Sequence, residues 1–367
     1  MPEIDWDVLM PAIKRRRCVL FLGPDAYPFD ASQTVEQAMW AKTTQNAAIV
    51  RKFYADDGLV LLQQPKHKLK FLESMEHFYT NTETNWSLTS LQLQKLIHIP
   101  FFAIINLTFD HLLKKNFDDA QLDCIEKHYI FRPSSSEKVI KELPLDSHKP
   151  LILNLLGSFT SSDNLVLTHK DLFLFITTLF NDKETWLKEL LHEADCFLFI
   201  GVPFEKWYMQ LLLQILSERT KSHEEVERYA LPENKVVKMA DLYTHELKIQ
   251  FVEATQQTVI DELYTFCEDN KLLNKPNADI RRYKNTDLQP IYRLLLRGEL
   301  NKGLESCGAW ANSADAADND LKNDLTLLMA RYNIMEKQKA ATTTEGYKVE
   351  YNSILFALLN LLDENDN

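Results

Sequence analysis

The chain has 367 residues, 45% hydrophobic and 26% charged, a composition typical of a soluble globular protein with room for two domains. Acidic residues outnumber basic ones by 53 to 41, and the net charge of −12 argues against nucleic acid as a partner. The five cysteines are scattered, the start is acidic and no apolar run is long, so we expect a cytoplasmic protein without a metal site, signal peptide or membrane partner.

The first strong pattern is a short helix, a buried strand and a glycine turn. Residues 6–16 have the spacing of an amphipathic helix, and Cys18–Leu22 is an apolar run typical of a strand buried on both faces. In nucleotide-binding folds a glycine such as Gly23 approaches a phosphate. Here Pro24 removes a backbone donor and Asp25 adds a negative charge, which favours a turn that only ends the strand.

The next part of the chain, residues 33–80, is interpreted as a set of helices with mixed polar and apolar faces. This interpretation includes two short apolar runs, 47–50 and 59–62. A stripe of apolar and aromatic residues at helical spacing near the end of this region is typical of a core. A helix over residues 88–97 then leads into the central strand.

The central strand covers residues 101–105 and ends in a polar turn that carries Asn106, Thr108 and Asp110 before a helical pattern begins. A strand, a polar turn and a helix form the unit that places ligand-binding groups at the carboxyl edge of a parallel sheet. The turn is therefore the first place to look for a functional site.

Further strands follow up to residue 268. They are predicted over 127–131, over 150–158 with Gly157 and Ser158 at its end, over 165–168, over 195–201 with a terminal Gly201, and over 227–231 and 246–252. Helices are predicted from a cap at Thr168 to Phe180 and over 207–217. Strands that alternate with helices predict an α/β fold, a mostly parallel sheet with helices on both faces.

The strand pattern ends in the last quarter of the chain. Residues 271–285 are polar and lack periodicity, so they are interpreted as a linker between a domain over 1–270 and a second one over 286–367. Helices are predicted over 288–297, 300–311 and 318–336, and from a capping box at 342–345 onward. These helices predict a small all-α bundle.

Residues 18–268 resemble the sirtuin-like (silent information regulator-like) domain of prokaryotic defence proteins. The resemblance rests on Phe21 to Gly23, Ile104 to Asp110, Leu153 to Phe159, Leu165 to Phe175 and Phe199 to Leu213. That family binds NAD with a three-layer Rossmann-like domain, and many of its members hydrolyse NAD. The cofactor-binding positions that the resemblance implies are Gly23, Asp25, Asn106, Asp110, Gly157, Ser158 and Gly201.

The departures from the family pattern fall on the positions that carry its chemistry. Thr108 occupies the slot of the catalytic asparagine, Leu156 occupies that of the catalytic histidine, and the Gly-Ala-Gly turn is degraded. Since leucine accepts no proton and the threonine hydroxyl has a short reach, the resemblance implies a pseudoenzyme with no cofactor. One alternative is an NAD hydrolase in which Asn106, Asp110 or His111 replaces the lost groups. Another is a nucleotide sensor that binds without turnover.

The C-terminal bundle resembles the effector-associated, death-like helical domains of bacterial conflict systems, on residues 291–304, 330–333 and 344–362. The resemblance implies a protein partner with a like domain, bound through 286–367, and self-association is a further option. The alternative is a bundle that only packs on its own sheet domain. The expected function is a scaffold, adaptor or sensor in an antiphage or conflict system that recruits an effector.

Overall fold

The computed structural model describes most of the chain. The described residues are 4–30, 32–80, 87–132, 149–181, 185–220, 226–232 and 237–276, followed by 291, 294–295, 300–313, 319–338, 347, 350–351, 353–354 and 357–358. The chain divides into two compact units, Met1–Asn277 and Ala278–Asn367.

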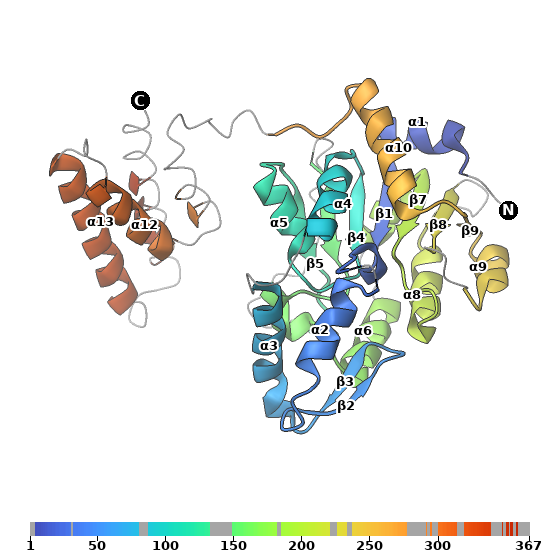
Figure 1. The fold of residues 1–367 in the computed structure, drawn as a ribbon, viewed down its shortest axis with the longest axis horizontal. Coiled ribbons are helices and arrows are strands. Elements are labelled where there is room, and N and C mark those ends of the chain that lie inside the picture. The colour runs from blue at the N-terminus through green and yellow to red at the C-terminus, as the bar shows by residue number, and fades with distance from the viewer. Residues whose placement is uncertain are drawn as a thin grey trace. The chain divides into compact units, whose positions relative to one another are not determined.

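A seven-stranded parallel sheet forms the centre of the first unit, in the order β5-β6-β4-β1-β7-β8-β9 (Figure 1). The strands are β1 (Cys18–Leu22), β4 (Ala103–Asn106), β5 (Ile125–His128), β6 (Leu151–Asn154), β7 (Cys196–Ile200), β8 (Glu227–Leu231) and β9 (Gln250–Phe251). With helices around this sheet, the α/β, Rossmann-like fold class is confirmed.

Each face of the sheet has its own apolar core, because successive side chains of a strand point to opposite faces. In β1, Leu20 and Leu22 belong to one buried cluster, whereas Val19 and Phe21 belong to the other. All residues of β1 are buried, as the continuous apolar run predicted.

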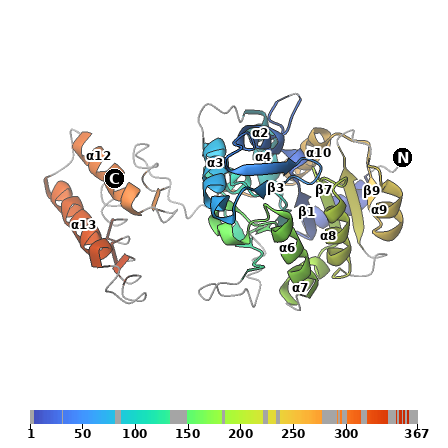
Figure 2. The same cartoon turned by 90° about the horizontal axis from the view of Figure 1, so that it is seen from below.

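Helices cover both faces, and their buried residues divide between the same two clusters (Figure 2). The first face is covered by α1 (Trp6–Lys14), α2 (Val35–Thr43), α3 (Lys68–Thr80), α4 (Ser87–His98), α5 (Leu112–Asp119) and α10 (Gln256–Asp269). The other face is covered by α6 (His169–Asn181), α7 (Thr185–His192), α8 (Trp207–Ser217) and α9 (Ala240–Glu246). Three short 3-10 helices, η1 (Pro24–Ala26), η2 (Pro65–His67) and η3 (Phe159–Asn164), lie in the connections.

The interpretation of residues 33–80 as helices is wrong in its middle part. β2 (Val50–Tyr54) and β3 (Leu59–Leu62) pair as an antiparallel hairpin, and Gly58 in its turn has a φ of +67°. A short apolar run has no period that separates a strand from a helix, whereas an Asp-Gly pair such as Asp57-Gly58 is a hairpin signal.

Two other predicted strands are also corrected. Residues 165–168 form no strand, although Leu167 accepts a hydrogen bond from the Val60 N–H. The strand predicted over 246–252 shrinks to β9, because α9 occupies the chain up to Glu246.

The second unit is helical and has its own apolar core. Its longer helices are α12 (Leu300–Ser313) and α13 (Asn319–Gln338), and Leu304, Leu325 and Leu358 belong to its core cluster. Most of the predicted linker at 271–285 and the capping box at 342–345 lie outside the described residues, so the domain boundaries stay a prediction. Among the helices that are described, none has both the length and the apolar character to cross a membrane.

Replacing Gly201 by alanine tests the tight contact between the turns that follow β1 and β7. Gly201 has a φ of +66°, and an added Cβ would lie 2.0 Å from the Ala26 nitrogen. The left-handed backbone and the overlap together predict that Gly201→Ala lowers the free energy of unfolding by about 2–4 kcal/mol. Chemical denaturation measures this change.

Gly308→Ala is the matched control. Gly308 lies within α12, and an added Cβ would meet only the Met329 Sδ, at 3.9 Å. Its replacement should be neutral, or stabilising by about 1 kcal/mol. Equal effects of the two substitutions would contradict the tight contact.

Candidate functional site

The carboxyl ends of four neighbouring strands bring the predicted site residues to one edge of the sheet. Leu22 at the end of β1 is paired with Asn106 of β4 and Ile200 of β7, and Asn106 is paired with Asn154 of β6. The chain continues from β1 toward β4 but from β7 toward β8, so the order reverses between β1 and β7. Ligands of open α/β sheets bind at such a reversal.

This reversal point is closed by backbone contact. The Gly23 N–H donates to the Ile200 carbonyl at 2.9 Å, and the Asp25 N–H donates to the Gly201 carbonyl at 3.0 Å. A Cβ on Gly23 would lie 2.2 Å from the Gly201 oxygen. Both glycines are therefore required for the two turns to approach each other.

The glycine turn has no backbone donor left for a phosphate. Besides the two bonds just described, the Ala26 N–H donates to the Gly23 carbonyl and the Tyr27 N–H to the Pro24 carbonyl, while Pro24 itself has no N–H. A phosphate-binding turn needs N–H groups that point outward. Here all four are used inside the protein.

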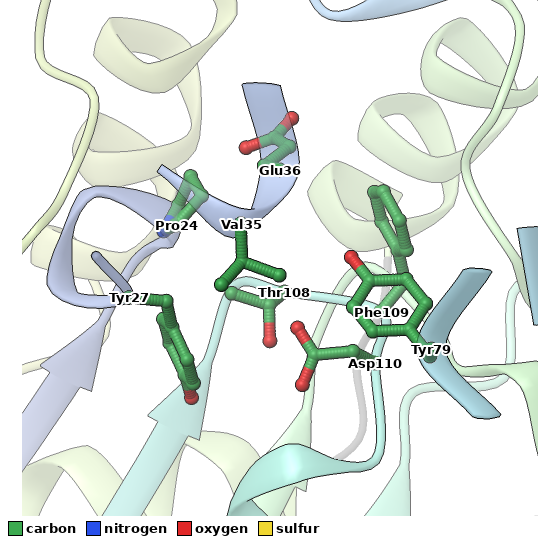
Figure 3. A pocket seen from close by; sticks show the side chains of 8 residues that line it. All are labelled: Pro24, Tyr27, Val35, Glu36, Tyr79, Thr108, Phe109 and Asp110. Carbon is green, nitrogen blue, oxygen red and sulfur yellow. The ribbon is translucent and has the colours of Figure 1, made fainter. Parts of the chain in front are cut away.

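A small pocket, the Asp110 pocket, lies beside this turn (Figure 3). Figure 3 shows the Asp110 carboxyl group close to the Thr108 hydroxyl, with the two tyrosines on either side. The lining residues are Pro24, Tyr27, Val35, Glu36, Tyr79, Thr108, Phe109 and Asp110. Two predicted site residues, Thr108 and Asp110, thus share one pocket.

The groups in the Asp110 pocket are pushed toward their uncharged forms. Burial raises the pKa of Asp110 to about 6, although the Leu112 N–H and the Thr108 hydroxyl oppose the shift. Burial, and then the nearby Asp110 charge, raise the pKa of Tyr27 and Tyr79 well above the ordinary value. Both phenols therefore stay protonated at neutral pH.

The Tyr27 hydroxyl is a buried polar group whose hydrogen bonding is incomplete. The residue is 1% exposed, and its hydroxyl makes no hydrogen bond of good geometry among the described residues, although the Thr108 side chain interacts with it and opposes the rise in the pKa of Tyr27. An unsatisfied buried hydroxyl costs about 1–3 kcal/mol, so such a group calls for an explanation. A ligand atom in the adjoining pocket would supply one.

Asn106, at the end of β4, lines neither pocket and is engaged in a buried hydrogen-bond network. Its Nδ2 donates to Asn154 Oδ1 at 2.9 Å, and its Oδ1 accepts from the Thr108 hydroxyl at 3.0 Å. The Asn154 Nδ2 in turn donates to Glu126 Oε1 at 2.7 Å. The sequence-based search missed Asn154 and Glu126, and the signal for Asn154 was its place at the end of a buried apolar run, like Asn106.

A second small pocket, the Lys206 pocket, has Leu156 in its lining. It is lined by Pro24, Glu36, Gly58, Leu59, Leu107, Phe109, Leu156, Val166, Pro203, Lys206, Tyr208 and Met209. The Lys206 Nζ lies 3.5 Å from Glu36 Oε1, which also accepts from the Trp40 indole at 2.9 Å. Burial opposes the Lys206 charge, but Glu36 holds the pKa of Lys206 above its ordinary value.

Glu36, at the start of α2, lines both pockets, and the sequence-based search missed it too. Thr34 and Gln37 form a capping box at the start of α2. This pattern of a threonine followed three residues later by a glutamine was the available signal, since it places Glu36 in the first turn of a helix.

The remaining predicted residues lie outside both pocket linings. His111 precedes α5, packs on the Phe159 ring at 5.5 Å, and has its pKa lowered by burial. Gly157 has a φ of +88°, and an added Cβ would lie 2.1 Å from the Asn164 carbonyl oxygen. Ser158 is fully buried beside it.

Comparisons with known proteins bear on both parts of the chain. Residues 103–252 match the family model of the SIR2-like domain, and residues 286–366 match that of effector-associated domain 11. A solved structure from work on the mechanism and regulation of Sir2 enzymes aligns at 11% identity with a TM-score of 0.36, over 71% of this chain and 95% of the other. No curated protein matches. The sirtuin-like and effector-associated resemblances are confirmed.

The raised pKa of Asp110 predicts a pH dependence of stability. Between pH 4 and 6 the native carboxyl group keeps its proton while the unfolded chain loses it, so the free energy of unfolding falls as the pH rises. The shift of about two units corresponds to about 3 kcal/mol. Asp110→Asn should remove this fall and make the protein more stable than the wild type at pH 7, as measured by denaturation across this range.

Asp30→Asn is the matched control with the opposite sign. Hydrogen bonds from Ser32 and Gln33 hold the pKa of the exposed Asp30 below its ordinary value. Its contribution is therefore present above the unfolded-state pKa and is lost as the pH falls. A wild-type stability that did not fall between pH 4 and 6 relative to Asp110→Asn would contradict the burial of an ionisable Asp110.

Proposed function

We propose that this chain, in which a SIR2-like domain is joined to an effector-associated domain, is a non-hydrolysing adaptor of a prokaryotic antiphage or conflict system. The SIR2-like part would act as a scaffold, and the helical part would recruit an effector that carries a like domain. The architecture is of the defence-system type. We infer the absence of turnover from Leu156, which stands in the position of the family's catalytic histidine.

Cleavage of the nicotinamide–ribose bond needs a group that accepts a proton near neutral pH. In the slot of the family's catalytic histidine, Leu156 is buried and takes part in the apolar wall of the Lys206 pocket, beside Leu107 and Val166. Asn106, the replacement weighed from the sequence, already uses its amide in hydrogen bonds to Asn154 and Thr108. His111 lines neither pocket.

The charges at the sheet edge also disfavour a dinucleotide. Asp25 lies in the glycine turn and Asp110 lies in the adjoining pocket, while the charge of Glu36 is balanced by Lys206. At an effective dielectric constant of 20, a carboxylate 5 Å from a phosphate charge costs about 3 kcal/mol. Because no free backbone donor offsets this cost, the binding of a diphosphate at the glycine turn would be unfavourable.

The helical part offers a surface for a partner. On α13, Leu327 is 62% exposed and Ile334 is 55% exposed, and two turns of helix separate them, so they share one face. Arg331 lies between them and pairs with Glu350 at 2.8 Å. An apolar stripe of this kind suits the groove or helix face of a like domain.

A second candidate function is a sensor that binds a ligand without turnover, and the observation in its favour is the buried Tyr27 hydroxyl, which makes no hydrogen bond of good geometry among the described residues. Together with Asp110 and Thr108, it lines a pocket whose groups are pushed toward their uncharged forms. The ligand would be a small, uncharged group with hydrogen-bonding atoms. If the chain is such a sensor, a compound of this kind should raise its melting temperature, and no reaction product should be released.

Incubation of the full chain with NAD, followed by chromatography of the products, tests the absence of turnover. We expect nicotinamide at the background rate of the buffer for the wild type, for Asn106→Ala and for the control Asn181→Ala, over a series of protein concentrations. Nicotinamide release by the wild type that Asn106→Ala abolishes and Asn181→Ala retains would establish the rival NAD hydrolase.

Recruitment is tested by measuring association between the full chain and a partner protein with an effector-associated domain from the same genomic neighbourhood. Leu327→Glu with Ile334→Glu should weaken binding at least tenfold, because each carboxylate would have to be desolvated in an apolar contact. Asn333→Glu, on the same helix and exposed, is the control and should leave the affinity unchanged. Unchanged binding of the double variant would exclude this face.

A further inference from the structure

Two neighbouring helices of the first unit carry an unusual concentration of exposed apolar side chains. Of the ten large apolar side chains that are exposed among the described residues, five lie on α6 and α8. Phe180 is 67% exposed and Phe173 is 57% exposed, and the others are Leu174, Trp207 and Leu211. Isolated exposed apolar residues are normal, whereas a contiguous group marks a contact surface.

These side chains form one continuous surface, which we name the α6–α8 face. The two helices pack against each other on the same side of the sheet, as both views show (Figures 1 and 2). Helical spacing places Phe173 and Phe180 along one side of α6, and Trp207 and Leu211 along one side of α8. The Phe173 and Trp207 rings join the two rows, with centroids 6.1 Å apart.

The α6–α8 face is nearly free of charge. α8 contains no charged residue in 11 positions, although the overall share of 26% predicts about three. In α6 the charged residues are confined to the first turn, where Asp171 is buried and bound to Arg132. A solvated helix face normally carries charges, so this composition is typical of a surface that is covered in the functional assembly.

The aromatic anchor of this face is held in place. The Trp207 indole N–H donates to Asp57 Oδ1 at 2.9 Å, and the His169 Nε2 lies 2.8 Å from Asp57 Oδ2. The turn of the β2–β3 hairpin thereby fixes one end of each helix. A rigid aromatic side chain loses little conformational entropy when a partner covers it.

We propose that the α6–α8 face is the interface between two copies of this chain, related by a two-fold axis. With full areas of about 150–250 Å² for an aromatic side chain, the five exposed side chains present on the order of 500 Å². Two copies would then bury on the order of 1,000 Å², which meets the area of about 1,000 Å² that a biological interface should exceed, before any rim contact is counted. In a two-fold dimer the same face serves on both copies.

The absence of charge on the α6–α8 face favours an uncharged partner surface, such as the same face of a second copy, over a charged partner. Each chain carries a net charge of −12, so two copies repel each other wherever charged surfaces meet. The α6–α8 face allows contact without desolvating a charge or pairing like charges. Since salt screens the long-range repulsion and no ion pair holds the interface, the dimer should become stronger at higher ionic strength. This proposal does not depend on the adaptor function.

Sedimentation velocity of the full chain over a concentration series tests the proposal. We expect a monomer–dimer equilibrium for the wild type, with a larger dimer fraction in 0.5 M than in 0.05 M NaCl. Phe180→Glu with Leu211→Glu should lower the association constant at least 100-fold. Leu69→Glu is the control, since Leu69 is 64% exposed on α3, outside this face, and its replacement should leave the equilibrium unchanged.

Three outcomes would overturn the proposal. A wild type that stays monomeric throughout the series would exclude a second copy as the occupant. If the double variant is then monomeric with a larger frictional ratio than the wild type, another part of the same chain covers the face. A dimer that the double variant retains would place the interface elsewhere. Circular dichroism of each variant checks that a loss of association does not come from unfolding.

Discussion

The approach of two glycine turns is the constraint on which the rest of the sheet edge depends. Gly23 and Gly201 bring the turns after β1 and β7 so close that a Cβ on either would overlap backbone atoms of the other turn. The contact uses the N–H groups that a phosphate would need and closes the point where the strand order reverses. Two small pockets lie beside this contact, the Asp110 pocket and the Lys206 pocket, and they share Pro24, Glu36 and Phe109.

The polar side chains at this edge mostly form hydrogen bonds and ion pairs with one another. Asn106 and Asn154 join the ends of β4 and β6 through their side chains, and a buried network of this kind is costly unless every member is satisfied. Lys206 and Glu36 likewise neutralise each other. The Tyr27 hydroxyl is the exception among the described residues that line the Asp110 pocket. The fold thus keeps the frame of a nucleotide-binding domain while its surfaces, the α6–α8 face and the α13 stripe, suit protein contacts.

Much of this fold could be predicted from the sequence, because long apolar runs have few structural solutions. Cys18–Leu22 is apolar throughout, lies between a helical pattern and a glycine turn, and is typical of a strand buried on both faces, and the order of the motifs placed Thr108 and Leu156 at the same sheet edge. The β2–β3 hairpin was missed, since the run 59–62 is too short to show a period. The roles of Tyr27, Glu36 and Asn154 could not be predicted, because they depend on contacts between segments far apart in the chain.

Calorimetric titration of the full chain with ADP-ribose tests whether the sheet edge has lost the capacity to bind a diphosphate. We expect no saturable heat up to millimolar ligand, because the glycine turn has no free N–H donor and acidic groups surround it. Saturable binding with a dissociation constant in the micromolar range, equivalent to about −8 kcal/mol, would contradict this loss. It would show that the backbone of Gly23 to Tyr27 rearranges to accept phosphate.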